Sequence, residues 1–382
     1  MGEANLTSAV APPSAAPPPS LPSIPGYRPV ALLGSGGMAS VWMAERRFDD
    51  DGETATERRW CALKVTHPYV VDEDVVQGRF RREAQVASML RHPNIAGVWR
   101  SGVFGRQLYL EMELIGGVSL ASLLSRMRER DAPVPQGLLW QLNDEVLSAL
   151  AYAHELRGAD GQSLGVVHRD LSPSNVLIGF DGRARIIDFG MVRACLGGFQ
   201  TMLGQIGGTP RYMSPEQARG RQVDRRSDLY SWAVVMAESL TGRPIVKTGN
   251  LPMTLRSVLN DPAPSLSTLD ASMPVGLDPI FASLLAKRPA ERPDTAEQVR
   301  QAIGAVVHAT RWTELDVGML VRRLFAARYD VFLRLKNDPP TSAAAATDDT
   351  ADVCPPMATT VVRTLPDTEV TLLQADAPPS SN

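Results

Sequence analysis

The spacing of the apolar residues changes near residue 118, and this change constrains the fold more than any other feature of the sequence. From residue 27 to about residue 118 apolar residues alternate between turn glycines, as in strands, with one helical interruption at 80–90. From Leu120 onward the spacing is mostly helical. This order predicts an α+β chain, in which a β-rich lobe with one key helix precedes a mainly helical lobe.

Individual elements follow from the same pattern. The strand-like runs are 29–33, 40–44, 60–66, 96–102 and 107–112, with short β-like pieces near Val166 and Ile186. The clearest helical stretches are 138–156 and 228–240. A further stretch at 314–335 has helical spacing, and we expect it to pack on the helical lobe or cap it, a dimer contact being the alternative.

Composition divides the chain into four parts. Residues 1–26 are rich in Ala, Pro and Ser, and residues 338–382 are rich in Pro, Ala, Thr and Asp, so both are expected to be disordered tails. The intervening unit is predicted at 27–305, with a helical extension at 306–337. Within the unit, a family resemblance described below implies a first lobe at about 27–112, a connecting hinge at about 113–118 and a second lobe at about 119–305.

Several classes of protein are disfavoured. The formal charge of −3, from 39 basic and 42 acidic residues, gives no overall field for nucleic acid or an anionic membrane. The longest apolar stretches, at 231–240 and 302–309, are shorter than the roughly 18–20 residues of a membrane span. The 3 cysteines are far apart and lack metal-site spacing. We therefore expect a cytoplasmic protein in a reducing compartment, without a membrane span, nucleic-acid partner or structural metal.

A glycine-rich turn and an inward-facing lysine are the first signs of chemistry. Residues 34–41 read GSGGMASV between two apolar runs, and such glycines let backbone N–H groups approach phosphate oxygens, although a hairpin without a ligand is equally common. Lys64, one of only 4 lysines, lies in the apolar strand at 61–65. A buried amine needs an anion, and Glu83 in the following helical stretch could supply it.

Three motifs in the second lobe settle how these features are interpreted. They are VHRDLSPSNV at 167–176, IDFG at 187–190 and MSPE at 213–216. Together with the glycine turn, Lys64 and Glu83, they resemble the ordered motifs of a eukaryotic-type (Hanks-type) Ser/Thr protein kinase of the bacterial branch. The resemblance covers about 27–305. It implies the bilobal protein kinase fold, and transfer of the γ-phosphoryl group of ATP to Ser and Thr hydroxyls of proteins, with autophosphorylation of the activation loop.

The resemblance also implies a role for each catalytic position. Asp170 would orient the substrate hydroxyl and accept its proton, while Lys64, paired with Glu83, contacts the α- and β-phosphates. Asn175 and Asp188 would hold Mg²⁺, for which Mn²⁺ could substitute. Met112 would be the gatekeeper beside the adenine, with Glu113 and Leu114 as hinge residues. The implied ATP-binding positions are Leu33, Gly34, Ser35, Gly36, Gly37, Met38, Val41, Ala62, Lys64, Met112, Glu113, Leu114 and Leu177, of which the apolar ones could equally be plain core.

Other positions receive structural or regulatory roles by the same resemblance. Asp228 would anchor the backbone of the catalytic loop, and Glu216 would pair with Arg292. Thr201 is the only hydroxyl-bearing residue between Gly190 and Gly208 and would be the activation-loop phosphosite, the alternative being a plain solvated threonine.

Two departures from the family pattern bear on activity. The third loop glycine is Ala39, and Ser172 stands where Ser/Thr kinases of this type usually carry a lysine that contacts the transferred phosphate. The alternative function is therefore a pseudokinase scaffold that binds nucleotide or partners without turnover. Tyrosine kinases also lack this lysine, but Thr209 in the peptide-positioning loop resembles the Ser/Thr class. A small-molecule kinase is disfavoured by the activation segment and its SPE motif.

Regulation is open at this point. Thr364 in the C-terminal tail is followed three residues later by Asp367, a pattern that phosphothreonine-reading forkhead-associated domains prefer, and it is a candidate docking site for such a partner. The acidic run at 49–53 predicts a solvated hairpin insertion rather than a metal site. The physiological substrates, the upstream signal and the oligomeric state do not follow from the sequence.

Overall fold

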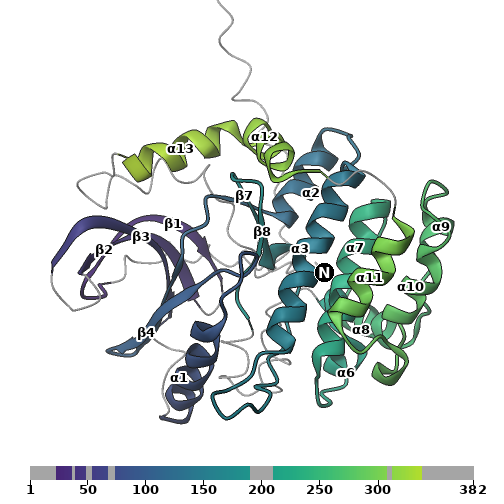
Figure 1. Ribbon diagram of the computed structural model, residues 1–382, viewed down its shortest axis with the longest axis horizontal. Coiled ribbons are helices and arrows are strands. Elements are labelled where there is room, and N and C mark those ends of the chain that lie inside the picture. Colours follow the sequence, from purple (N-terminus) through teal and green to yellow (C-terminus); the bar gives the residue numbers. More distant parts are fainter. Residues whose placement is uncertain are drawn as a thin grey trace, which may run out of the picture.

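A five-stranded antiparallel sheet forms the first lobe, and it lies beside a larger helical lobe (Figure 1). This computed structural model describes residues 23–36, 39–48, 54–67, 74–189, 210–307 and 312–337. The strand order is β1-β2-β3-β5-β4. The strands are β1 (Tyr27–Ser35), β2 (Ala39–Phe48), β3 (Thr54–Thr66), β4 (Val98–Phe104) and β5 (Gln107–Glu113), and helix α1 (Asp74–Met89) packs beside β4. The five predicted strands and the predicted helix of this lobe are confirmed.

Strand register gives the sheet two different faces. Val41 lies opposite Lys64, and Ala62 lies opposite Met112. Because opposed residues of antiparallel strands share a face and side chains alternate along a strand, these four side chains lie on one face. On this face α1 contributes Phe80 to a buried cluster.

The intervening residues of β3 lie on the other face. There Cys61, Leu63 and Val65 pack with Ile24 and Tyr27 in a separate cluster. Because side chains alternate along a strand, the face of the sheet that carries Lys64 is the one that packs against the rest of the molecule.

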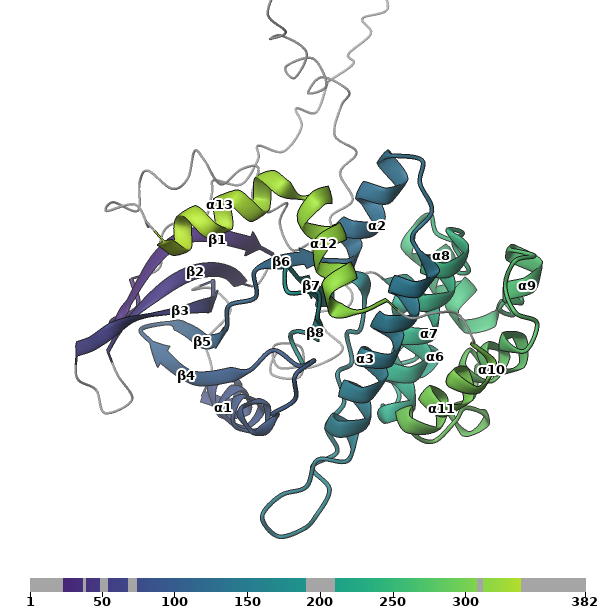
Figure 2. The ribbon, with the colours of Figure 1, turned by 45° about the horizontal axis from the view of Figure 1, so that its top comes forward.

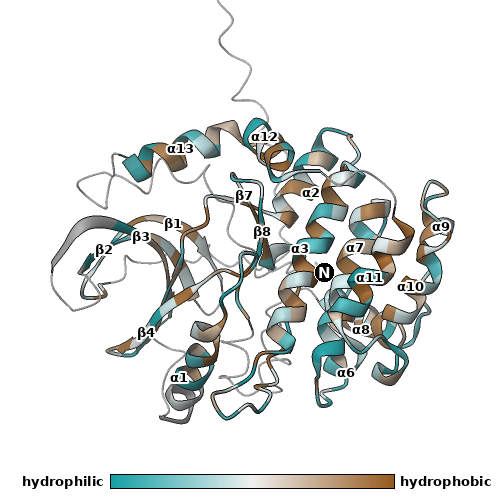
Figure 3. Cartoon of the chain, in the orientation of Figure 1, coloured by the Kyte–Doolittle hydropathy of each residue, from teal (hydrophilic) through white to brown (hydrophobic). Residues whose placement is uncertain are grey.

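Helices dominate the second lobe and surround a small three-stranded sheet. Its elements are β6 (Gly117–Ser119), α2 (Leu120–Glu129), α3 (Gln136–His154), η2 (Pro173–Asn175), β7 (Val176–Gly179), β8 (Ala184–Ile186), η3 (Pro210–Tyr212), α6 (Pro215–Ala218), α7 (Arg225–Thr241), α8 (Leu251–Asn260), α9 (Leu266–Leu269), α10 (Leu277–Leu284), η4 (Pro289–Glu291) and α11 (Ala296–Val306). Helix α7 begins after Asp224, whose side chain accepts the Arg226 N–H, and ends at Gly242 with φ 64°. In Figure 3, α2, α3 and α11 carry both hydrophilic and hydrophobic stretches, as expected of helices with one packed face.

One short element was predicted at the wrong place. The β-like piece near Val166 is not a strand, whereas β7 ten residues later is one and was not predicted. The apolar residues around Val166 lead into a loop whose backbone N–H groups are bound by a side chain rather than by a neighbouring strand, as described below. The β-like piece near Ile186 is confirmed as β8.

The C-terminal extension consists of two helices rather than the single predicted one. Helix α12 (Glu314–Leu324) is separated from α13 (Ala326–Asn337) by Phe325, which has φ −128° and ψ 43°. Helix α12 packs on the helical lobe, as predicted, through the fully buried Val317 and Val321. Helix α13 continues past β6 toward the β1 edge of the sheet, so that the extension crosses from one lobe to the other (Figures 1 and 2). None of the helices that the structure describes is long and apolar enough to cross a membrane.

Candidate active site

A buried aspartate holds the loop that connects α3 with β7. Asp228, in the first turn of α7, accepts hydrogen bonds from the backbone N–H groups of His168 at 2.8 Å and Arg169 at 2.9 Å. His154 Nε2 lies 2.9 Å from Asp228 Oδ2, the oxygen that also accepts the His168 N–H. Burial acts to raise the pKa of Asp228, but the hydrogen bond and charge of His154, with those of His168, outweigh it and hold the pKa below its ordinary value. The aspartate is thus a charged anchor for the loop.

Two residues near this anchor adopt a left-handed backbone conformation. Arg169 has φ 66° and Asp188 has φ 61°. Such conformations cost non-glycine residues of order 1–3 kcal/mol and persist where the surroundings enforce them. Asp228 holds the Arg169 N–H, and Gln217 Nε2 donates to the Arg169 carbonyl at 2.6 Å. The loop therefore has a conformation imposed from both sides.

Asp170 and Asp188, the acidic residues of the motifs at 167–176 and 187–190, contact an asparagine and a lysine respectively. Lys64 Nζ forms an ion pair with Asp188 Oδ1 at 2.7 Å. Asn175 Nδ2 donates to the Asp170 carbonyl at 2.7 Å and to Asp170 Oδ2 at 3.3 Å. The Ile187 N–H donates to the Asn175 carbonyl at 3.0 Å, which brings the two motifs together.

His168 adds a second connection between the catalytic loop and the Asp188 segment. Its Nε2 lies 2.8 Å from the Ile187 carbonyl oxygen, and its ring meets the Phe189 ring edge-on with centroids 4.8 Å apart. The structure thus assembles Lys64, Asp170, Asn175 and Asp188, four of the five residues for which a catalytic role was predicted.

The fifth, Glu83, lies on α1 and is half-buried. It was expected to pair with Lys64, whose ion pair here is the one with Asp188. Helix α1 packs beside β4 at the rim of the same site.

The polar atoms at this site fit a divalent cation held together with phosphates. Asn175 donates through its amide nitrogen, so its amide oxygen is available as a ligand, and Asp188 supplies a carboxylate. Oxygen ligands of this kind suit Mg²⁺, which is usually bound through one or two side chains plus substrate phosphates. The described residues hold no cluster of three or more His, Cys, Asp or Glu that could bind a metal without such phosphates.

The glycine turn joins β1 to β2 above this site. Gly34 lies opposite Val41 and Ser35 opposite Ser40, and the Gly36 N–H donates to the Ala39 carbonyl at 2.9 Å. Gly37 and Met38 lie outside the described residues. The expected apolar positions Val41 and Ala62 are buried, and Leu33 and Leu177 are half-buried.

The segment between β5 and β6 is fixed at its start. Glu113 forms two hydrogen bonds with Gly97 in the loop before β4. Its backbone N–H donates to the Gly97 carbonyl at 2.8 Å, and its side-chain Oε2 accepts the Gly97 N–H at 3.2 Å. Arg185 Nε lies 3.3 Å from Glu113 Oε1. Leu114 follows at once and is half-buried.

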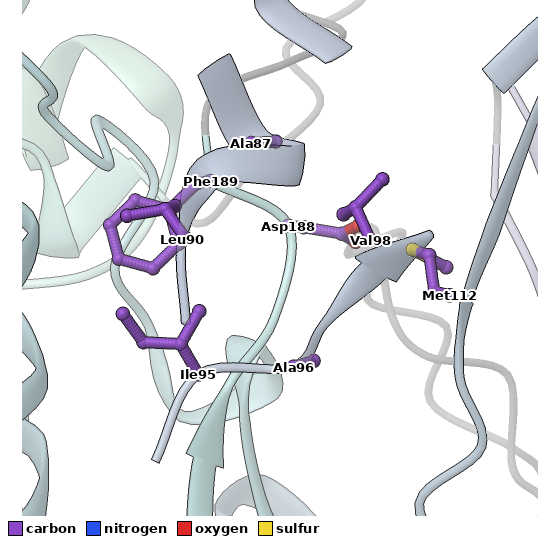
Figure 4. A pocket seen from close by; sticks show the side chains of 8 residues that line it. All are labelled: Ala87, Leu90, Ile95, Ala96, Val98, Met112, Asp188 and Phe189. Carbon is purple, nitrogen blue, oxygen red and sulfur yellow. The ribbon is translucent and has the colours of Figure 1, made fainter. Parts of the chain in front are cut away.

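A small apolar pocket lies behind Met112. Its walls come from the end of α1, from β4 and the loop before it, and from the Asp188 segment (Figure 4). The lining residues are Ala87, Leu90, Ile95, Ala96, Val98, Met112, Asp188 and Phe189. Met112 therefore lines this pocket on the same face of the sheet as Val41 and Ala62.

Glu216 and Arg292, predicted as a pair, form a buried bidentate ion pair with 2.7 and 2.8 Å contacts.

Sequence reasoning missed His154 and Gln217, because a lone histidine or glutamine on a helix usually signals nothing more than packing or solvation. Thr201, Thr209 and Thr364 lie outside the described residues.

Comparisons with known proteins agree with this geometry. The protein kinase domain family matches residues 27–302. PknD, a Ser/Thr-protein kinase of Mycobacterium tuberculosis, is 34% identical over 267 residues, which cover 70% of this chain and 37% of PknD. MasK, a tyrosine-protein kinase of Myxococcus xanthus, is 31% identical over 287 residues, which cover 74% of this chain and 44% of MasK. The chain thus spans less than half the length of these two relatives.

A solved structure shows the same fold. The crystal structure of the PknI kinase domain of M. tuberculosis has a TM-score of 0.56 at 26% identity, and the match covers 74% of this chain and 97% of that one. The expected α+β, bilobal kinase fold is confirmed. From the family match, the fold and the motifs gathered around Lys64 and Asp228, we conclude that the chain belongs to the protein kinases, in their bacterial eukaryotic-type branch.

Proposed function

We propose that this protein is a Ser/Thr protein kinase that transfers the γ-phosphoryl group of ATP to Ser and Thr hydroxyls of proteins, with Mg²⁺ as its metal. Protein kinases use ATP and a divalent metal in general. The observation that carries the proposal is the ion pair between Lys64 and Asp188 beside the hydrogen-bonded Asp170 and Asn175. This arrangement gathers a cation from β3, a carboxylate from the segment after β8, and a carboxylate and an amide from a loop held by a buried aspartate.

Each of these groups has a task in phosphoryl transfer. Lys64 pairs with Asp188, and with ATP bound it would contact the α- and β-phosphates. Asp188 and Asn175 would hold the metal, which supplies neutralisation of phosphate charge. Asp170 would orient the substrate hydroxyl and accept its proton, because the Asn175 amide fixes the direction of its carboxylate.

The choice of Ser and Thr over Tyr rests on Thr209 and on the similarity to PknD, which is named a Ser/Thr-protein kinase, whereas MasK is named a tyrosine kinase. Ser172 is buried at 7% exposure and brings no charge to the site. Phosphate neutralisation therefore falls to Lys64 and the metal. Within the same proposal, Thr201 is the activation-loop phosphosite, and phosphorylated Thr364 would dock a phosphothreonine-reading domain.

Incubation of the full chain with labelled ATP and Mg²⁺, followed by mapping of phosphosites by mass spectrometry, tests the proposal. We expect label on Ser or Thr, including Thr201, in wild type and in the control Asp160→Asn, whose carboxylate lies in an exposed turn. Asp170→Asn should remove the label. Label on Tyr alone would overturn the Ser/Thr assignment. ATP binding without turnover, also with Mn²⁺, would favour the scaffold and make Ser172→Lys the first variant to test for restored transfer.

A further inference from the structure

The C-terminal helices contact the two backbone segments that border the proposed nucleotide site, and they lie outside the residues that the kinase family matches. The first segment is the hinge, which we define as residues 113–116 between β5 and β6. The second is the β7–β8 hairpin, residues 176–186, which begins directly after Asn175 and ends two residues before Asp188. Any group that fixes both segments fixes the geometry of the site.

Phe332 of α13 lies directly on the hinge backbone. A side-chain carbon added at Gly116 would be 2.4 Å from Phe332 Cε1 and 2.5 Å from Cζ, closer than carbon atoms pack. The absence of a side chain at Gly116 is therefore what admits the ring. The Gly116 carbonyl in turn accepts the Phe180 N–H at 2.7 Å, which joins the hinge to the hairpin.

Phe180 is the centre of an aromatic cluster formed by the β7–β8 hairpin and α13. Its ring meets Tyr329 edge-on with centroids 4.9 Å apart, and Phe332 at 6.0 Å. Phe180 itself is buried at 6% exposure. Phe180 of the hairpin thus contacts the hinge through its backbone N–H and α13 through its ring.

The backbone of helix α12 lies close to the backbone at the tip of the same hairpin. A side-chain carbon at Gly182, where φ is 90°, would lie 1.7 Å from the Glu314 carbonyl oxygen. One at Gly318 would lie 2.9 Å from the Phe180 carbonyl oxygen. Across this contact Arg183 Nε forms an ion pair with Glu314 at 2.9 Å.

The two helices differ in how firmly they are held. Helix α12 contributes Val317, Val321 and Leu324 to the main core, whereas α13 has no buried residue. Helix α13 is therefore attached mainly by the faces of Tyr329 and Phe332, and its contact with the hinge can be altered without disturbing the core.

We infer that α12 and α13 form a brace that positions the hinge and the β7–β8 hairpin for nucleotide binding, with Phe332 as the positioning residue on the hinge. The inference rests on the proposed function, because it takes the hinge to be the adenine-contacting segment. It assigns to residues beyond the part of the chain that the kinase family matches a share in the affinity for ATP. Loss of the Phe332 ring should loosen Gly116 and Phe180 while leaving Asp170 in place.

The test compares Phe332→Ala with Leu333→Ala, a neighbour on the same helix that is exposed at 36%. Full-length protein should show, for Phe332→Ala, a KM for ATP raised about three- to tenfold, the weight of one aromatic contact, with kcat little changed. Amide hydrogen exchange should accelerate in peptides covering 176–183 and not in peptides from α7. Leu333→Ala should match wild type in both.

A second variant tests the contact from the hinge side. Gly116→Ala should raise the KM for ATP when Phe332 is present, because the methyl group displaces the ring, and should add little in the Phe332→Ala background. Equal effects of Gly116→Ala in both backgrounds would contradict the brace.

Failure of the inference and failure of the proposed function can be told apart. Faster exchange in Phe332→Ala with an unchanged KM would overturn the positioning role and leave a packing contact only. Exchange and KM both equal to those of Leu333→Ala would overturn the brace altogether. A wild-type protein that bound no fluorescent ATP analogue would remove the proposed function, and with it the nucleotide role of Phe332.

Discussion

Arg292 donates from Nη1 and Nη2 to the two carboxylate oxygens of Glu216, and the guanidinium lies over the Tyr230 ring at 4.8 Å. The Ser227 hydroxyl also donates to Glu216. Both charged side chains are buried, and Arg292 also donates to the carbonyl oxygens of Ala286 and Arg226. The pair joins α6 to the loop before α11.

Arg292→Ala should destabilise the protein strongly, because it leaves a buried carboxylate without its cation. Breaking one partner of such a pair costs about 3–5 kcal/mol, which corresponds to a Tm lower by roughly 5–8 °C in a protein of this size. Thermal unfolding followed by circular dichroism measures it. Arg288→Ala, whose side chain is 83% exposed, is the control and should stay near wild type. A Tm of Arg292→Ala equal to that of the control would show that Glu216 finds another partner.

The same carboxylate should make stability depend on pH in the acid range. Burial acts to raise the pKa of Glu216, but hydrogen bonds from Arg292 and Ser227 and the charge of Arg292 lower it below its ordinary value. Because the folded pKa is depressed, the contribution is complete above the unfolded value of about 4.5 and is lost as the pH falls through the folded value. Asp228 acts in the same direction.

Urea unfolding at a series of pH values below 6 checks this expectation. The free energy of unfolding of wild type should fall as the solution is acidified, and Glu216→Gln should fall less steeply although it starts lower. Glu129→Gln, at a side chain that is 58% exposed, should parallel wild type. Parallel curves for wild type and Glu216→Gln would mean that this carboxyl does not titrate differently on folding.

Asp228→Asn should lower kcat while leaving the KM for ATP little changed. The amide of the new side chain cannot accept the N–H groups of both His168 and Arg169, so the loop that carries Asp170 shifts, and a misplacement of about 1 Å can cost about 10²-fold in rate. Steady-state phosphorylation of a generic protein substrate separates the two constants. Asp224→Asn is matched to it, since asparagine caps a helix as well as aspartate does. A kcat near that of Asp224→Asn would argue against the anchoring role.

Cys61 should resist alkylation in the folded protein. Its side chain is fully buried, and burial, followed by the charge of Glu111, raises the pKa of the thiol well above its ordinary value. Iodoacetamide treatment with and without denaturant, read by mass spectrometry of the peptide, should label Cys61 only after unfolding. Rapid labelling under native conditions would show that the sheet opens at β3.

Much of the fold followed from the sequence because long elements carry many periodic residues. Strand β3 and helix α7 are examples, and their positions matched the pattern to within a few residues at most ends. Strand β7 was missed because four residues give no usable period. The break at Phe325 was missed because Leu320, Leu324 and Phe332 keep helical spacing across it.

The site itself was predictable only where a motif marked it. Asp170, Asn175 and Asp188 were visible in this way, and Lys64 stood out because lysines are rare in this chain. His154 carries no such mark, since its function depends on a distance to Asp228 that arises only from the packing of α3 against α7. The Phe332 contact likewise depends on the path of a helix beyond the motifs.

The loop between α1 and β4 lies within the first lobe in the sequence, but it packs with the second lobe. Leu90 and Ile95 are part of the main core. The Asn94 carbonyl accepts the Ile186 N–H of β8, and the Ala96 N–H donates to the Ile186 carbonyl. Among the described residues, the sheet is therefore attached to the second lobe through this loop as well as through residues 113–116. Rotation about an axis through these two attachments would move β1, at the far end of the sheet from β4, more than the end of α1, which directly precedes this loop.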